Sequence, residues 1–185
     1  MTGDGGTPLL TLEPFIEAVR EGVDRSGWVL SGLQKTTSYQ FEGRWEGDST
    51  RSAYLFFHHP VGPEWASVDV YLDETSRGLT GNLALVVDTR DLGGLGDVAS
   101  AIGALRALWD DAMVPGHRTA LTLRLRSRRG GDPLRAEGEV RFKLVMPRGT
   151  TERGGVAVSS LAGEVVSAFQ ALIDDPRLAE FREEE

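Results

Sequence analysis

The sequence predicts a single α+β domain, an antiparallel sheet of about six or seven strands with three helices packed on it. Three stretches space their apolar residues as a helix does, and the stretches between them alternate apolar with polar residues as strands do. Short polar turns join the strands, so neighbours should pair antiparallel. No internal repeat or low-complexity linker divides the 185 residues. We therefore expect one domain, residues 1–185, with a disordered tail at 1–8 and an acidic tail at 182–185.

Each expected helix begins near a residue that can cap it. Thr11 precedes the first, Asp97 the second, and Ser159 or Ser160 the third, and their side-chain oxygens can accept backbone amide hydrogens. Each stretch then has one apolar stripe, which predicts one buried face. The expected buried residues are Leu12, Phe15, Ile16, Val19 and Val23; then Val98, Ala101, Ile102, Leu105, Leu108 and Trp109; then Leu161, Val165, Ala168, Phe169 and Leu172.

The expected strands lie at 28–33, 39–45, 53–58, 67–72, 79–87, 119–128 and 133–146. The strand at 53–58 has apolar residues on both faces, which is typical of a central strand. The last two should form a hairpin with Gly130-Gly131 as a two-residue turn, because both turn positions need positive φ. That turn sets a register in which the following pairs face each other: Leu121 and Val140, Leu123 and Gly138, Leu125 and Ala136, Arg124 and Glu137.

Composition excludes several classes of protein. Without cysteine there are no disulfides, thiolate metal ligands or cysteine nucleophiles, which favours a reducing, cytoplasmic location. The first residues lack a signal-peptide pattern and the longest apolar run, Leu83–Val87, is too short to span a bilayer, so no membrane association is expected. Net charge is −8, although residues 118–153 hold ten Lys or Arg against four Asp or Glu. The acidic remainder argues against nucleic-acid binding, and the Arg-rich hairpin is interpreted as a solvated strand face.

No catalytic, metal or cofactor residue is predicted. The three histidines are His58, His59 and His117, and neighbours in a strand point to opposite faces, so the first two should not share a metal. There is no Gly-x-Ser-x-Gly motif. Five carboxylates at expected strand ends and turns could hold Mg²⁺ or act in acid–base catalysis, although turn and capping roles also explain them. These are Asp69, Asp73, Glu74, Asp88 and Asp91.

One glycine motif follows a strand and opens a helix. Gly94-Leu-Gly96-Asp-Val-Ala99 matches G-x-G-x-x-A, and backbone amides at a helix start attract phosphate. Six residues separate it from the preceding strand, and the neighbouring strands are expected to be antiparallel, unlike those of a dinucleotide-binding unit. We therefore assign no cofactor to it.

Four aromatic residues in the meander cannot all face one core if the sheet is covered on one side. Either the N-terminal helix covers the second face, or part of that face is a contact surface. On the second interpretation these residues would bind a partner: Tyr54, Phe56, Trp65 and Tyr71.

The order of elements resembles the type III secretion chaperone-like fold, including the YbjN-like family of small acidic bacterial proteins. The matching stretches are Leu12–Val23, Tyr39–Val87, Val98–Trp109, Leu121–Met146 and Leu161–Leu172. The resemblance implies a non-enzymatic, chaperone-like, protein-binding homodimer. Three alternatives stay open: a helix-on-sheet pocket for a small molecule or lipid, a metal-dependent enzyme using strand-end carboxylates, and a nucleic-acid binder using the Arg-rich hairpin.

Overall fold

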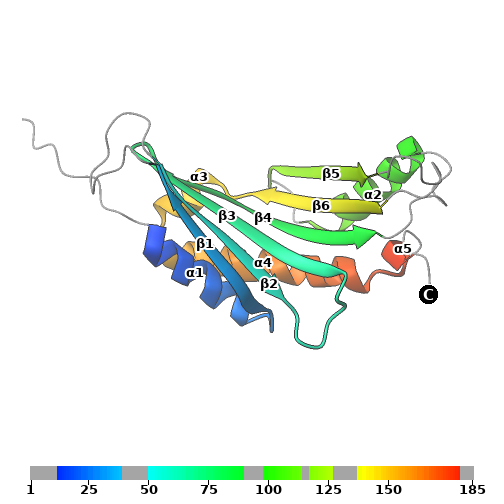
Figure 1. The fold of residues 1–185 in the computed structure, drawn as a ribbon, viewed down its shortest axis with the longest axis horizontal. Helices are drawn as coiled ribbons and strands as arrows, with labels where there is room; N and C mark the ends of the chain where they lie inside the picture. Colours follow the sequence, from blue (N-terminus) through cyan, green and yellow to red (C-terminus); the bar gives the residue numbers. More distant parts are fainter. Residues whose placement is uncertain (1–11, 39–49, 90–97, 114–116, 127–136, 180–185) are drawn as a thin grey trace, which may run out of the picture.

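The computed structural model describes residues 12–38, 50–89, 98–113, 117–126 and 137–179. Six strands form one antiparallel sheet in the order β1-β2-β3-β4-β6-β5 (Figure 1). The strands are β1 (Val29–Thr37), β2 (Thr50–His58), β3 (Ala66–Thr75), β4 (Gly78–Thr89), β5 (Thr119–Arg126) and β6 (Glu137–Val145). The helices are α1 (Leu12–Asp24), α2 (Val98–Ala112), α3 (Arg148–Glu152), α4 (Gly155–Asp174) and α5 (Pro176–Ala179). The predicted α+β class and antiparallel sheet are confirmed.

The long helices share one face of the sheet. In β3 the residues Ala66, Val68, Val70, Leu72 and Glu74 are buried, and those between them are only half-buried. Alternate residues point to opposite faces, so the buried set faces the helices. Figure 1 shows α1 and α4 side by side behind the sheet. We call this the inner face, and the opposite one the open face.

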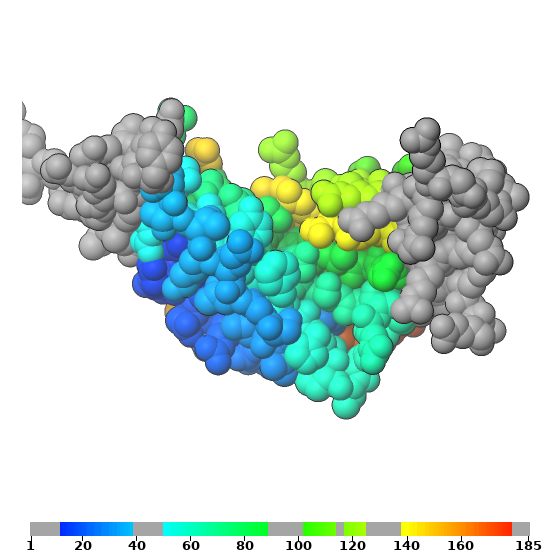
Figure 2. All heavy atoms as spheres, in the orientation of Figure 1, coloured from blue at the N-terminus to red at the C-terminus, as the bar shows by residue number. Residues whose placement is uncertain are grey.

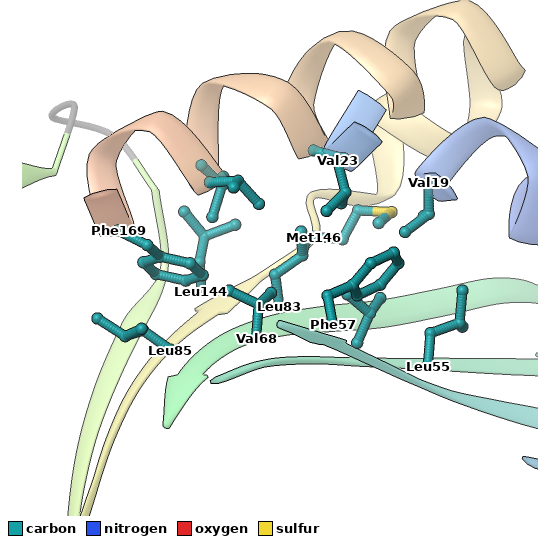
Figure 3. Packing of buried hydrophobic residues seen from close by; sticks show 14 of the residues in the cluster. Val19, Val23, Leu55, Phe57, Val68, Leu83, Leu85, Leu144, Met146 and Phe169 are labelled. Atoms are coloured by element: carbon teal, nitrogen blue, oxygen red, sulfur yellow. The ribbon is translucent and has the colours of Figure 1, made fainter. Parts of the chain in front are cut away.

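The core fills the layer between the inner face and the helices. Figure 3 shows Val19 and Val23 of α1 and Phe169 of α4 pointing toward strand residues such as Phe57 and Leu83. Trp109 of α2 joins the same core through rings 5.8 Å from Phe169 and 5.5 Å from Phe142. Burial of large side chains at this density is the main stabilising contribution to the fold.

The predicted helix stripes are largely confirmed. All five stripe residues of α1 are buried, as are Leu105, Leu108 and Trp109 of α2. Ile102 was expected in the α2 stripe, and this expectation is wrong because its side chain is 41% exposed. Among the α2 side chains that the structure describes, the buried apolar ones lie in the later turns, whereas the side chains of the stripe residues Val98 and Ala101 lie outside the described set.

Helices α1 and α4 approach closely at Gly22. A Cβ at this position would overlap the Ser159 carbonyl oxygen and lie 2.9 Å from the Cβ of Ala162. Gly163 lies on the other side of the same contact, where its Cβ would be 3.3 Å from the Gly22 carbonyl oxygen. The two backbones can therefore approach this closely only because Gly22 has no side chain.

The hairpin of β5 and β6 has the predicted faces and a different register. Leu121 lies opposite Phe142, Leu123 opposite Val140 and Arg124 opposite Glu139, so each predicted partner is wrong by two residues. Side-chain alternation repeats every two residues, so a shift of two keeps every face unchanged and the apolar pattern cannot detect it. Gly130-Gly131, from which the register was taken, lies outside the described residues.

The predicted cap of the last long helix is wrong. Helix α4 begins at Gly155, preceded by Gly154 at φ +91°, and Ser159 lies inside the helix, 4% exposed. Part of the expected polar loop is the short helix α3.

By length and composition α4 could span a membrane, a test that buried helices of soluble proteins also pass.

Several expectations concern parts of the chain that the structure does not describe. They are the cap residues Thr11 and Asp97, the strand at 39–45, the Gly94–Gly96 motif, Asp91 and the two tails. The first described strand, β1, extends to Thr37 and is longer than the strand expected at 28–33.

Candidate functional site: the open face of the sheet

The open face carries no helix among the described residues, since α1, α2 and α4 all contribute to the inner-face core. Figure 2 views the molecule from this side and shows strand residues at the surface. Of the two alternatives, coverage of the second face by the N-terminal helix is therefore wrong. The physical reason is that the stripe of α1 packs with α4 and the inner face instead.

Three of the four predicted aromatic residues lie together on the open face. Tyr54 is directly opposite Tyr71 in the β2–β3 ladder, and Phe56 is opposite Asp69. Opposite residues share a face. The rings of Tyr54 and Tyr71 are 4.6 Å apart, and Tyr54 and Phe56 are 40% and 38% exposed. We call Tyr54, Phe56 and Tyr71 the aromatic patch.

The fourth predicted residue, Trp65, lies just before β3. It is half-buried and packs against the inner core, and its carbonyl oxygen accepts the Asp88 amide at 2.8 Å. Trp65 is thus engaged in packing the end of the sheet, and we expect it to add less to a contact surface than the aromatic patch.

Hydrogen bonds anchor the aromatic patch on one side. The Ser52 hydroxyl donates to Asp73 at 2.6 Å and lies 3.4 Å from the Tyr71 hydroxyl. Burial raises the pKa of the Tyr71 phenol above its ordinary value, and the nearby Asp73 carboxylate acts in the same direction. The phenol therefore stays protonated at neutral pH and remains a hydrogen-bond donor.

An ion-pair network lies beside the patch, across β3, β6 and β5. Arg141 contacts Asp69 at 3.2 Å and Glu139 at 2.6 Å, and Arg124 is 3.9 Å from Glu139. Burial raises the pKa of the Asp69 carboxyl, and Arg141 opposes this effect without cancelling it. Sequence reasoning missed this network because Asp69 and Arg141 lie on strands separated by β4.

The carboxylates that could act in acid–base catalysis or hold Mg²⁺ do not converge. Asp88 and Asp73 do lie near the ends of β4 and β3, as expected, whereas Asp69 lies within β3, so its expected placement at a strand end or turn is wrong. Glu74 faces the inner side, is 2% exposed and pairs with Arg51 at 3.2 Å. Within the described part of the chain, no three His, Asp or Glu residues group in a way that could hold a metal.

The adjacent histidines occupy different surroundings. His58 is exposed at the end of β2, whereas His59 is half-buried and packs edge-on against Trp28, with ring centroids 5.6 Å apart. A Cβ at Gly62 would lie 2.7 Å from that of His59, so this glycine makes room for the imidazole. The described surroundings of His59 are those of a packing residue.

Two clefts lie away from the open face. One of about 490 Å³ is lined by Phe15, Arg77 and Arg148 and by hydroxyl residues near the β3–β4 turn. Another of about 400 Å³ is lined by His117, Arg153 and Glu164 near the start of α4. The first lies at one end of the layer between helices and sheet, since Phe15 of α1 and Leu79 of β4 belong to the core, and most of its other lining residues are polar.

Comparisons with models of known protein families, with curated protein sequences and with solved structures found no match for this chain.

Proposed function

We propose that this chain is a non-enzymatic, chaperone-like module of the cytoplasm that works as a homodimer and binds a partner protein through its open sheet face. The observation that carries the proposal is the aromatic patch, where Tyr54 and Phe56 stay about two-fifths exposed on a strand inside the sheet.

Aromatic side chains supply much of the affinity of protein interfaces, because they bury a large area at low cost in conformational entropy. The two sheet strands hold the patch in place, with Tyr71 beside Tyr54 and its hydroxyl 3.4 Å from that of Ser52. A partner that covers Tyr54 and Phe56 would therefore gain apolar burial without first ordering the surface.

The ion-pair network would supply orientation more than affinity. Asp69 and Asp73 lie next to the aromatic patch, and Arg124, Arg141 and Lys143 lie on the strands beyond β4. The β3 side of the open face thus carries acidic and aromatic residues, and the β6–β5 side carries three basic residues interspersed with Glu139. A partner segment with apolar residues between a basic and an acidic end would fit that order.

The alternatives have less support. Buried side chains occupy the layer between the helices and the inner face, and the cleft at one end of it is lined mostly by hydroxyl and charged residues, which suits a lipid poorly. An enzyme using the carboxylates would need Asp69, Asp73 and Glu74 to converge, yet Glu74 points to the opposite face. The Arg-rich hairpin has Glu139 paired with both Arg124 and Arg141, which weakens its attraction for phosphate.

A photo-crosslinking amino acid placed at position 56 tests the proposal in cells, with the same group at position 156 as the control. Val156 is 86% exposed on α4, away from the sheet. We expect position 56 to yield a covalent adduct with another protein and position 156 to yield none of the same mass. No adduct at position 56, or identical adducts at both positions, would contradict the proposal.

A further inference from the structure

Strand β1 forms one edge of the sheet and has the exposure of a strand that lacks a neighbour. Seven of its nine residues are exposed, on both faces, including Val29 and Leu33 at 44% each. Leu33 faces the inner side, since it lies opposite the buried Leu55. The described helices therefore leave the Leu33 part of β1 uncovered, and within the described residues a further strand would have access to it.

One hydrogen bond fixes which backbone groups point outward. The Ser38 amide donates to the Thr50 carbonyl at 3.0 Å. In an antiparallel ladder such bonding residues alternate, so Gln34 and Thr36 also bond to β2. Leu33, Lys35 and Thr37 then direct their amide and carbonyl groups toward the open edge. These groups form a template for another antiparallel strand.

Edges of this length are usually protected by charges, proline or irregular geometry. From Val29 to Thr37 the only charge is Lys35 and there is no proline. A bulge lies between Leu30 and Gly32, which leaves Gly32–Thr37 regular. We infer that this segment is the dimer edge, where β1 of a second copy pairs antiparallel to form a continuous twelve-stranded sheet. This inference rests on the homodimer half of the proposed function.

A second copy fits this edge better than an unrelated strand, because an antiparallel pair about a twofold axis is complementary to itself. Placing Lys35 on the axis would oppose two like charges. An axis at Gln34 instead sets Leu33 against the aliphatic stem of the partner copy's Lys35, which covers the exposed leucine. Both Lys35 ammonium groups then lie between the two α1 helices, whose exposed charges are Glu13, Glu17, Arg20, Glu21 and Asp24.

The arrangement would also join the two open faces. The twofold axis of such a pair is perpendicular to the sheet, so both aromatic patches lie on one side. The two β2 strands would be three strand spacings apart, about 14 Å. One extended partner segment could then contact Tyr54 and Phe56 of both copies.

A proline substitution can block pairing at the β1 edge without unfolding the chain. Lys35→Pro removes an outward amide while the β2 ladder keeps its bonds, so the chain should stay folded and become monomeric by light scattering. Lys35→Thr, which removes the charge and keeps the amide, should remain dimeric. Tyr54→Ser should remain dimeric as well, which distinguishes failure of this inference from failure of partner binding at the open face.

Cysteine cross-linking tests the register in a chain that has no cysteine of its own. Gln34→Cys should form a disulfide-linked dimer on mild oxidation, since residues on the axis lie about 4.5 Å apart between Cα atoms. Val61→Cys, 90% exposed at the β2–β3 connection, should not. A monomeric unsubstituted chain, a dimeric Lys35→Pro variant, or a dimeric Gln34→Cys variant that does not cross-link would each overturn the inference. Protection of β1 edge amides from hydrogen exchange in a monomer would show that the chain covers its own edge.

Discussion

Gly22→Ala places a methyl group where α1 meets α4. The new Cβ would overlap the Ser159 carbonyl oxygen and lie 3.0 Å from its carbonyl carbon. Those atoms belong to the backbone of α4, so the helices must separate. Overpacking of this kind costs about 1–3 kcal/mol, and a clash with backbone belongs at the upper end. Alanine recovers about 1 kcal/mol of helix propensity, which leaves a net loss of about 2 kcal/mol. Tm should then fall by about 4–8 °C.

Gly103→Ala is the matched control, because Gly103 lies in α2 with nothing within 4 Å of the added Cβ. Here the helix propensity acts alone, and the variant should gain roughly 0.5–1 kcal/mol. Urea unfolding followed by circular dichroism measures both variants against the unsubstituted chain. If Gly22→Ala is as stable as Gly103→Ala, the claim that α1 and α4 leave no room for a Cβ at position 22 is contradicted.

Three further predictions concern the charged and aromatic groups. Arg51→Leu removes an ion-pair partner of the buried Glu74 and should destabilise the fold by about 3 kcal/mol in urea unfolding; the smaller effect of the double change with Glu74→Gln would verify the coupling. Burial raises the pKa of the Asp69 carboxyl above its ordinary value of 3.8. Between that value and its pKa in the folded chain, the folded state binds more protons than the unfolded state, so the free energy of unfolding falls as pH rises through this range. Asp69→Asn has no carboxyl to titrate, so its free energy of unfolding relative to that of the unsubstituted chain should rise from acid to neutral pH. If this difference in free energy does not change with pH, burial does not raise the pKa of Asp69. Burial raises the pKa of the Tyr71 phenol above its ordinary value of 10.0, so Tyr71→Phe should remove from an absorbance titration a tyrosine that titrates above that value, and loss of one that titrates at or below it would contradict the raised pKa.

Local periodicity was enough to predict the fold class and most of the core. The stripe of α1 and the alternation of β3 each have one buried face, and burial follows directly from that pattern. Periodicity could not fix the hairpin register, since Leu121 faces the core whether it pairs with Val140 or Phe142. It also could not place the start of α4, where Gly154 and α3 replace a side-chain cap.

The candidate site was predictable only in part. Aromatic residues on both faces of 53–58 indicated an apolar second face, and Tyr54 and Phe56 do lie exposed there. Which face the N-terminal helix covers depends on packing between α1 and α4, and the glycine that permits it, Gly22, has no distinctive sequence pattern. The Asp69–Arg141 pair depends on strand order, because β6 lies next to β4 only after the chain has passed through α2 and β5.

The most direct test of the account is the affinity of the purified chain for the protein captured at position 56. Phe56→Ser should weaken this binding by about 30-fold, the effect of losing an anchor worth roughly 2 kcal/mol. Val61→Ser, which removes an apolar side chain that is 90% exposed outside the aromatic patch, should leave the affinity within about twofold. Equal affinities for Phe56→Ser, Val61→Ser and the unsubstituted chain would show that the open face is not the partner-binding surface.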